Sequence, residues 1–148
     1  MKQSPDIIRK ATKALENAIE NKNVAEVLAS FADDCEIELL RQRLFGKEGV
    51  RKWLDWLYKN LWQIKFQPIV IVVKGTTLFE EFIVRARLHS GVEIKSKQAQ
   101  VVVYENDKIK SLRLYFDRLD FAESVTKDLV SKAAVNRIIK KSLAGLVD

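Results

Sequence analysis

The sequence predicts an α+β domain, because helix-like and strand-like hydrophobic patterns occupy separate stretches of the chain. Near the N-terminus, apolar residues recur every three or four positions, which is typical of one face of an amphipathic helix. Four later segments are rich in β-branched and aromatic residues and are joined by short turns, which indicates an antiparallel meander. We therefore expect helices and a curved antiparallel sheet in separate layers.

Two helices are predicted at the N-terminus. The first covers residues 6–21 and is opened by Ser4, Pro5 and Asp6. The second covers residues 24–31, after a turn at residues 21–23. The first helix is expected to bury one apolar stripe, formed by Ile7, Ile8, Ala11, Leu15, Ala18 and Ile19.

A strand and a third helix follow. Cys35, Ile37 and Leu39 alternate with two glutamates, the period-two pattern of a strand with one buried face. A basic loop at residues 41–43 then leads into a strongly amphipathic helix. The stripe of that helix consists of Val50, Trp53, Leu54, Leu57, Tyr58 and Leu61.

The rest of the core is predicted to be β-structure. Strands are expected near residues 64–74, 78–89, 93–104 and 108–116, with turn residues between them. A helical pattern resumes after Asp117. We expect one domain over residues 1–148, with residues 124–148 forming an extra C-terminal helical segment.

Composition excludes several classes of protein. The 148 residues suit one domain, and 47% apolar with 31% charged residues describes an ordinary globular chain. A single cysteine, Cys35, excludes an intramolecular disulfide and a multi-cysteine zinc site. The longest apolar run, residues 69–73, is far too short to span a bilayer, and the N-terminus lacks a secretory signal. We expect a cytoplasmic protein without metal or cofactor.

Three segments resemble a known family. Residues 28–34 (LASFADD) precede a strand and residues 45–50 (FGKEGV) open a helix, as at the start of SnoaL-like domains, and residues 111–117 (SLRLYFD) resemble their end. Over residues 7–123 the chain thus resembles the SnoaL-like and ketosteroid-isomerase-like members of the nuclear transport factor 2-like superfamily. The resemblance implies a cone-shaped sheet packed against N-terminal helices. Such cones host isomerases, hydrolases, dehydratases, cyclases and non-catalytic domains, so the fold leaves the function open.

The resemblance also implies where catalytic groups would lie, and they are absent from the sequence. Ketosteroid isomerases use a carboxylate, a tyrosine and a protonated aspartic acid. The residues aligned with these groups are Leu39, Leu15 and Ala99. Limonene-epoxide-hydrolase-like members use two aspartates bridged by an arginine, and the residues aligned with that triad are Leu114, Ile83 and Arg85.

The same alignment indicates which side chains face the interior of the cone. The inward sets are nearly all apolar, so we expect an interior without an ion pair, either a filled core or a cavity for a hydrophobic ligand. Outward alternates on the sheet, namely Ile83, Gln98, Gln100, Val102 and Tyr104, favour homodimerisation. The candidate ligand-binding residues are Cys35, Ile37, Leu39, Trp53, Leu57, Phe82, Val84, Ala99, Val101, Leu114, Phe116 and, at the cavity mouth, Glu80.

Several single residues receive a structural interpretation. His89 shares parity with two arginines and is expected outside the cavity. Cys35 is expected to be a buried, inert thiol. Asp117, and Asp120 with Glu123, are expected to accept backbone hydrogen bonds next to a helix.

The leading hypothesis is a SnoaL-like domain that binds a small apolar molecule. One alternative is an isomerase, hydrolase or cyclase with a different constellation, using Glu80 or His89 with the arginines Arg41, Arg43, Arg85 and Arg87 at the mouth. Another is an interaction module in which the basic C-terminal helix contacts protein or nucleic acid, although a solvated basic face is the more common case. The apolar positions of that tail, which are Val125, Leu129, Ile138, Ile139, Leu143 and Leu146, predict that it docks on its own domain or on a dimer mate.

Overall fold

The N-terminal helices of the computed structural model, which describes residues 4–126 and 128–147, lie where the hydrophobic pattern predicts them. Helix α1 spans Pro5–Glu20 and helix α2 spans Val24–Ser30. Ser4 caps α1, since its side chain accepts a hydrogen bond of 3.3 Å from the Ile7 amide, and Pro5 occupies the first helical position, where no amide hydrogen is needed. The buried face of α1 holds the predicted apolar residues Ile8, Leu15, Ala18 and Ile19.

In the described part of the chain, six strands form one sheet in the order β2-β1-β6-β5-β4-β3. Strand β1 pairs in parallel with β6, and every other neighbouring pair is antiparallel. The predicted four-strand meander is confirmed as β3 to β6. The strands are β1 (Phe31–Leu39), β2 (Gln42–Phe45), β3 (Leu61–Lys74), β4 (Thr77–Leu88), β5 (Glu93–Glu105) and β6 (Lys108–Tyr115).

Strand β2 replaces the expected basic loop at residues 41–43. Leu40 and Arg41 both have positive φ angles, 51° and 65°, so a two-residue turn closes a tight hairpin between β1 and β2. Such turns usually carry glycine or asparagine, and neither is present here, which is why the sequence did not reveal the hairpin. Across it, Arg43 Nε lies 3.0 Å from Glu36 Oε1.

Helix α3 (Gly46–Asn60) packs closely on this hairpin because of its glycines. Gly46 has a φ of +65°, and a Cβ atom at Gly49 would lie 2.8 Å from the backbone of Leu44. The FGKEGV segment therefore opens a helix that approaches β2 more closely than a side chain would allow.

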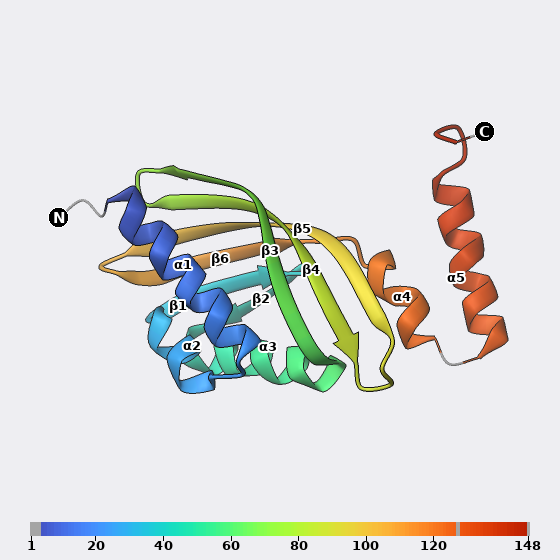
Figure 1. Cartoon of the computed structure of the whole chain (residues 1–148), viewed down its shortest axis with the longest axis horizontal. Coiled ribbons are helices and arrows are strands. Elements are labelled where there is room, and N and C mark those ends of the chain that lie inside the picture. The colour runs from blue at the N-terminus through green and yellow to red at the C-terminus, as the bar shows by residue number, and fades with distance from the viewer. Residues whose placement is uncertain (1–3, 127, 148) are drawn as a thin grey trace.

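The sheet curves around the helices, as Figure 1 shows: α1 and α3 lie on its concave side, α4 (Leu119–Val125) lies at one end, and α5 (Leu129–Ser142) stands away from the rest. Register shifts in β3 at Pro68/Val70 and in the β5–β6 pair at Val103/Tyr104 mark bulges, which bend strands and increase their twist. This is the α+β cone architecture that the sequence predicted.

One half of the cone is a filled core. Ile37, Leu112, Val102 and Leu78 are paired in register across β1, β6, β5 and β4. Each of the four is at most 1% exposed. This row of side chains fills one end of the cone. The residues next to it on the same inner face, Glu80, Gln100 and Leu114, lie toward the other end.

The side-chain parity predicted for β5 was wrong. On its inner face lie Ile94, Ser96, Gln98, Gln100, Val102 and Tyr104, all buried. Ala99, Val101 and Val103 lie on the opposite, outer face, because they alternate with the buried set and are only half-buried. Consequently four of the five residues expected on a dimer surface point inward, and of that set Ile83 alone is outward.

Helix α5, in the C-terminal segment, does not dock on the domain. Helices α4 (Leu119–Val125) and α5 (Leu129–Ser142) follow β6, and α5 has no buried residue. Leu129 is 85% exposed, and Ile138, Leu143 and Leu146 are also exposed. Docking on the chain's own surface is thus contradicted for these residues, while the side chain of Val125 and all of Lys127 lie outside the described part of the structure.

Candidate functional site

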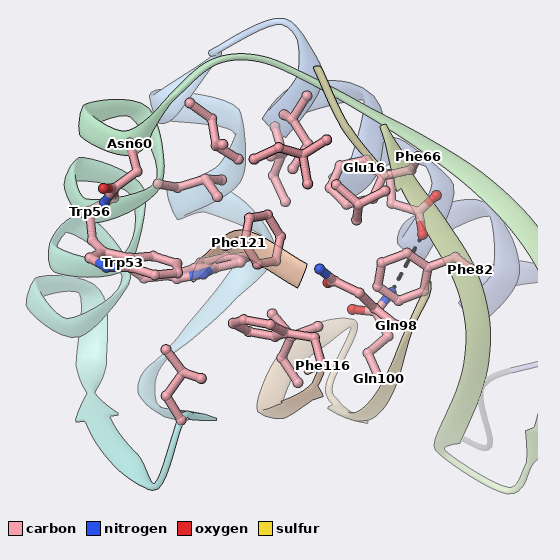
Figure 2. A pocket seen from close by; sticks show the side chains of 18 of the residues that line it. Glu16, Trp53, Trp56, Asn60, Phe66, Phe82, Gln98, Gln100, Phe116 and Phe121 are labelled. Atoms are coloured by element: carbon pink, nitrogen blue, oxygen red, sulfur yellow. Dashed lines mark hydrogen bonds between the residues drawn. The ribbon is translucent and has the colours of Figure 1, made fainter. Parts of the chain in front are cut away.

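A cavity of about 320 Å³ occupies the half of the cone that the core leaves unfilled. It lies between α1, α3, the start of α4 and the inner faces of β3 to β6 (Figure 2). Nearly all of its wall is apolar. The apolar lining residues are Leu15, Ile19, Leu40, Trp53, Trp56, Leu57, Leu61, Ile64, Phe66, Phe82, Val84, Leu88, Ile94, Leu114, Phe116 and Phe121.

Aromatic side chains form two sides of the cavity. Phe66 and Phe82, from adjacent strands, meet edge to face with ring centroids 5.7 Å apart. Phe116 meets Phe121 of α4 in the same way at 5.6 Å. Trp53 and Trp56 face them from α3 (Figure 2). Rings in these arrangements gain attraction beyond the area they bury, so the walls are well defined.

Helix α4 is held at this end of the cone by polar contacts. Ser96 Oγ donates a hydrogen bond of 2.6 Å to Asp120 Oδ2, and Asp117 Oδ1 accepts one of 2.9 Å from the Leu119 amide. Arg118, at the cavity edge, donates to the Leu40 carbonyl over 2.9 Å. Asp117 thus accepts a backbone hydrogen bond, as the sequence predicted. Asp120 also has a structural role, but its hydrogen bond comes from the Ser96 side chain and not from the backbone. The side chain of Glu123 lies outside the described part.

A buried carboxyl pair interrupts the apolar wall. Glu16, from α1, is 6% exposed and lines the cavity, and Glu80, from β4, is 1% exposed directly behind it. Gln100 Nε2 donates to Glu80 Oε1 at 2.7 Å and lies 3.4 Å from Glu16 Oε1. Burial, a hydrogen bond with Glu80 and the negative charge of Glu80 together raise the pKa of Glu16 to about 9. Glu16 therefore carries its proton at neutral pH.

Tyr104 lies next to the carboxyl pair. Its hydroxyl shares a hydrogen bond of 2.8 Å with Thr12 Oγ1 of α1. Burial, together with the charges of Glu16 and Glu80, raises the pKa of Tyr104 to about 12, against the opposing effect of Thr12. The phenol thus stays neutral and ties β5 to α1.

No ion pair with a lysine, arginine or histidine reaches Glu16 or Glu80 in residues 4–126 and 128–147. Glu80 Oε2 is buried and has no nitrogen or hydroxyl donor within hydrogen-bonding distance there. The interior is thus free of ion pairs, as predicted, but the expectation of an almost wholly apolar interior was wrong. No cluster of metal-ligating side chains occurs in the same residues.

The predicted ligand-binding residues fall into three groups. Trp53, Leu57, Phe82, Val84, Leu114 and Phe116 line the cavity. Cys35, Ile37 and Leu39 are buried in the hydrophobic core and are not among the residues that line the cavity. Glu80 is buried behind Glu16 instead of lying at the mouth. Ala99 and Val101 lie on the outer face. Burial raises the pKa of the Cys35 thiol, which fits an inert cysteine.

The alternative catalytic constellation is not brought together. His89 is exposed, with Nε2 3.0 Å from the Tyr58 carbonyl. Arg87 is directed outward and pairs with Glu93 at 2.7 Å. The other arginines, Arg41, Arg43 and Arg85, are also exposed.

Sequence reasoning missed Glu16, Gln98 and Gln100. A usable signal existed for Glu16, because Thr12 and Glu16 continue the three- and four-residue spacing of Ile8, Leu15 and Ile19. Polar residues on an apolar stripe are buried with it and need a partner there. The two glutamines had no such signal, since on β5 the opposite face carries the more apolar set.

Comparisons with known proteins agree with this architecture. The model of the SnoaL-like domain family matches residues 11–112, so the chain belongs to the SnoaL-like domain family. No match was found among curated proteins. No helix of the described residues is long and apolar enough to cross a membrane.

Solved structures similar to this chain share its fold. A putative polyketide cyclase from Xanthomonas campestris pv. campestris is 16% identical with a TM-score of 0.75, over 82% of this chain and 98% of the other. An epoxide hydrolase from M. tuberculosis, described as LEH-like, is 19% identical with a TM-score of 0.69, over 87% and 96%. A protein of ketosteroid-isomerase-like fold from Catenulispora acidiphila, in complex with trimethylamine, is 14% identical with a TM-score of 0.70, over 81% and 92%. At these identities the likeness shows the fold alone.

Proposed function

We propose that this chain binds a small, largely apolar molecule in the cavity of its cone. The observation that carries the proposal is a cavity of about 320 Å³ with an almost entirely apolar wall, inside a domain whose other half is densely filled. Ligand sites in proteins are typically concave, apolar and about 300–1,000 Å³ in size, so this one suits a small ligand.

The few polar groups of the wall would orient such a molecule. Gln98 lies between Phe82 and Phe116, and its amide nitrogen is 3.3 Å from Ser96 Oγ (Figure 2). Its side-chain oxygen has no hydrogen bond of its own among those found in the described residues and suits a ligand donor. Glu16 and Gln100 add a second polar position deeper in the cavity.

Known structures of this fold support a small-ligand function. The Catenulispora acidiphila protein is in complex with trimethylamine, so a chain with this fold holds a small organic molecule. The Xanthomonas protein, described as a putative polyketide cyclase, has an almost full-length likeness to this chain. A buried, unpaired thiol at Cys35 is in keeping with a cytoplasmic location, which we retain as part of the proposal.

We further propose that the domain forms a homodimer through the outer face of its sheet. The surface differs from the one that the sequence suggested, because the inner and outer sets of β5 are exchanged. In register across the outer face lie Val72, Phe79, Val101 and Arg113 in one row and Val70, Glu81, Ala99 and Tyr115 in the next, so apolar side chains run across both rows with one charged residue in each. Phe79 is 42% exposed and Tyr115 is 52% exposed. A contiguous surface of this kind is typical of an interface.

Calorimetric titration with 1-adamantanol, a compact hydrocarbon cage with one hydroxyl, tests the binding function. Saturable binding at one site is expected. Val84→Phe places a ring inside the cavity and is expected to abolish binding, since Val84 lines the wall. Val92→Phe makes the same change at an exposed turn outside this cavity and should leave binding intact. Equal binding by both variants, or none by the wild type, would contradict the proposal.

A further inference from the structure

The carboxyl pair at the deep end of the cavity has no counter-ion. Glu16 and Glu80 touch a common amide, Gln100, and are at most 6% exposed. Burial and the neighbouring Glu80 raise the pKa of Glu16, so Glu16 holds its proton at neutral pH. It lies beside the negative charge of Glu80, and no lysine, arginine or histidine of the described residues forms an ion pair with either group.

The charged groups around the pair do not neutralise it. Along α1, Lys13 lowers the pKa of Glu16 and Glu20 raises it, and both effects are smaller than that of burial. Glu20 is already engaged, since it accepts a hydrogen bond of 2.8 Å from the Phe66 amide and lies 3.6 Å from Lys65 Nζ. From β5, Gln100 and Tyr104 supply neutral groups only.

A buried negative charge without a cation is costly, and buried charges in proteins are normally paired with a group of opposite charge. Here the uncompensated charge borders an open volume, because Glu16 and Gln100 line the cavity. Phe66 and Phe82 flank the same spot, and their ring faces attract cations (Figure 2). Apolar walls with one negative, aromatic-flanked end match the shape of a hydrocarbon that carries a single positive charge.

We propose that the deep end of the cavity binds the ammonium group of an apolar amine, with Glu16 accepting its hydrogen bond and Glu80 behind it supplying the negative charge. The inference rests on the proposed function, since it names the ligand class of that cavity. Carboxylate ligands are excluded by the same charge. Neutral ligands of equal shape bind through the walls alone.

Three ligands that share one cage test the ammonium subsite: 1-adamantanamine, 1-adamantanol and 1-adamantanecarboxylate, titrated by calorimetry at pH 7 into the full chain. The amine is expected to bind about tenfold more tightly than the alcohol, the advantage of a charged over a neutral hydrogen bond. The carboxylate is expected to bind most weakly. Equal affinities for amine and alcohol would overturn the subsite while leaving the cavity function intact, and no binding of any of the three would overturn both.

Substitutions test whether the carboxyl pair causes the preference for the amine over the alcohol. Glu80→Gln removes the negative charge behind Glu16, so it is expected to remove the tenfold preference for the amine and to keep the affinity for the alcohol. Glu81→Gln is the matched control, since Glu81 is the next residue of β4 and points to the outer face. Should Glu80→Gln fail to fold, as judged by circular dichroism, Glu16→Leu makes a second test, because it removes the oxygen that accepts the ammonium hydrogen bond. Unchanged amine preference in a folded Glu80→Gln or Glu16→Leu protein would overturn the proposal.

Discussion

Gln100 donates a hydrogen bond of 2.7 Å to Glu80, and this pairing explains why the inner face of β5 is polar at its centre. The two residues lie opposite each other in register on β5 and β4. A carboxyl group buried at this depth needs a donor from its own sheet. The remaining inner face is mostly apolar, so Gln100 is the side chain that satisfies Glu80 there. The same amide nitrogen also contacts Glu16 of α1.

The free energy of unfolding should depend on pH through Glu16. Its pKa rises from 4.5 to about 9 on folding, so between these values the folded state holds one more proton than the unfolded state. The stabilising effect is fully present below pH 4.5 and is lost as pH rises toward 9, at up to about 1.4 kcal/mol per pH unit. Urea unfolding of the wild type and of Glu16→Gln at several pH values measures this pH dependence of the free energy of unfolding.

The difference in free energy of unfolding between the wild type and Glu16→Gln reports the contribution of Glu16, because the other titrating groups are present in both proteins. Relative to Glu16→Gln, the wild type is expected to lose stability steadily from pH 5 to pH 9. Parallel pH profiles for the two proteins would show that Glu16 is ionised in the folded state and would contradict its raised pKa.

The filled and hollow halves of the cone should respond differently to the same truncation. Leu112 is 1% exposed in the filled row, so Leu112→Ala leaves a new void and is expected to cost about 3 kcal/mol. Leu114, two residues along β6, already borders the cavity, so Leu114→Ala is expected to cost less than half as much. Denaturant unfolding of both variants checks this, and equal losses would mean that the cavity is filled in solution.

The sequence was sufficient for the fold because the local patterns agree with one another. Alternation in β1, β4 and β6 and the three- and four-residue spacing of α1 and α3 each placed apolar residues on one face. The structure confirms those faces, except that Ile7 of the predicted α1 stripe is 52% exposed. On β5 the rule failed. Val101 and Ala99 are the more apolar alternates, yet the inner positions hold Gln98 and Gln100. Gln100 hydrogen-bonds to the buried acids, and Gln98 hydrogen-bonds to Ser96.

The site was harder to predict because it depends on contacts between distant segments. Glu16 and Gln100 are separated by 84 positions and meet only when α1 packs across the sheet. The hairpin to β2 was missed for a different reason, since the two left-handed residues that form its turn, Leu40 and Arg41, are not of the usual type. Long-range contacts and unusual turns leave little trace in a single sequence.

Dimerisation is expected to depend on Phe79. Phe79→Arg places a charge in the outer row beside Val72 and Val101, where apolar residues of two copies would meet. Light scattering should give a dimer mass for the wild type and a monomer mass for the variant. Ile7→Arg, at a residue that is 52% exposed on α1, a helix on the concave side of the sheet (Figure 1), is the control and should remain dimeric. A monomeric wild type would show that the outer face is not an interface.

The C-terminal segment should be dispensable for the stability of its own domain. Helix α5 has no buried residue in the structure and contacts α4, so deleting residues 127–148 removes little packing. We expect the free energy of unfolding to change by less than about 1 kcal/mol, a typical limit for surface changes. A large loss would mean that Leu129, Ile138 or their neighbours are covered in solution, by this domain or by a dimer mate.

The same deletion tests whether the exposed basic residues of α5 bind nucleic acid. Lys132, Arg137, Lys140 and Lys141 are all exposed, and polyanion binding through them would weaken steeply with salt because phosphate contacts release counter-ions. We expect no salt-sensitive binding to a duplex DNA or RNA probe at 150 mM salt (an ordinary physiological ionic strength, about 0.15 M), since scattered surface lysines are usually solvated. The measurement is fluorescence anisotropy across a salt series, with the full chain and the deleted chain side by side. Tight binding by the full chain that is lost on deletion would assign the segment to nucleic acid, whereas binding that persists after deletion would place any such site on the sheet domain.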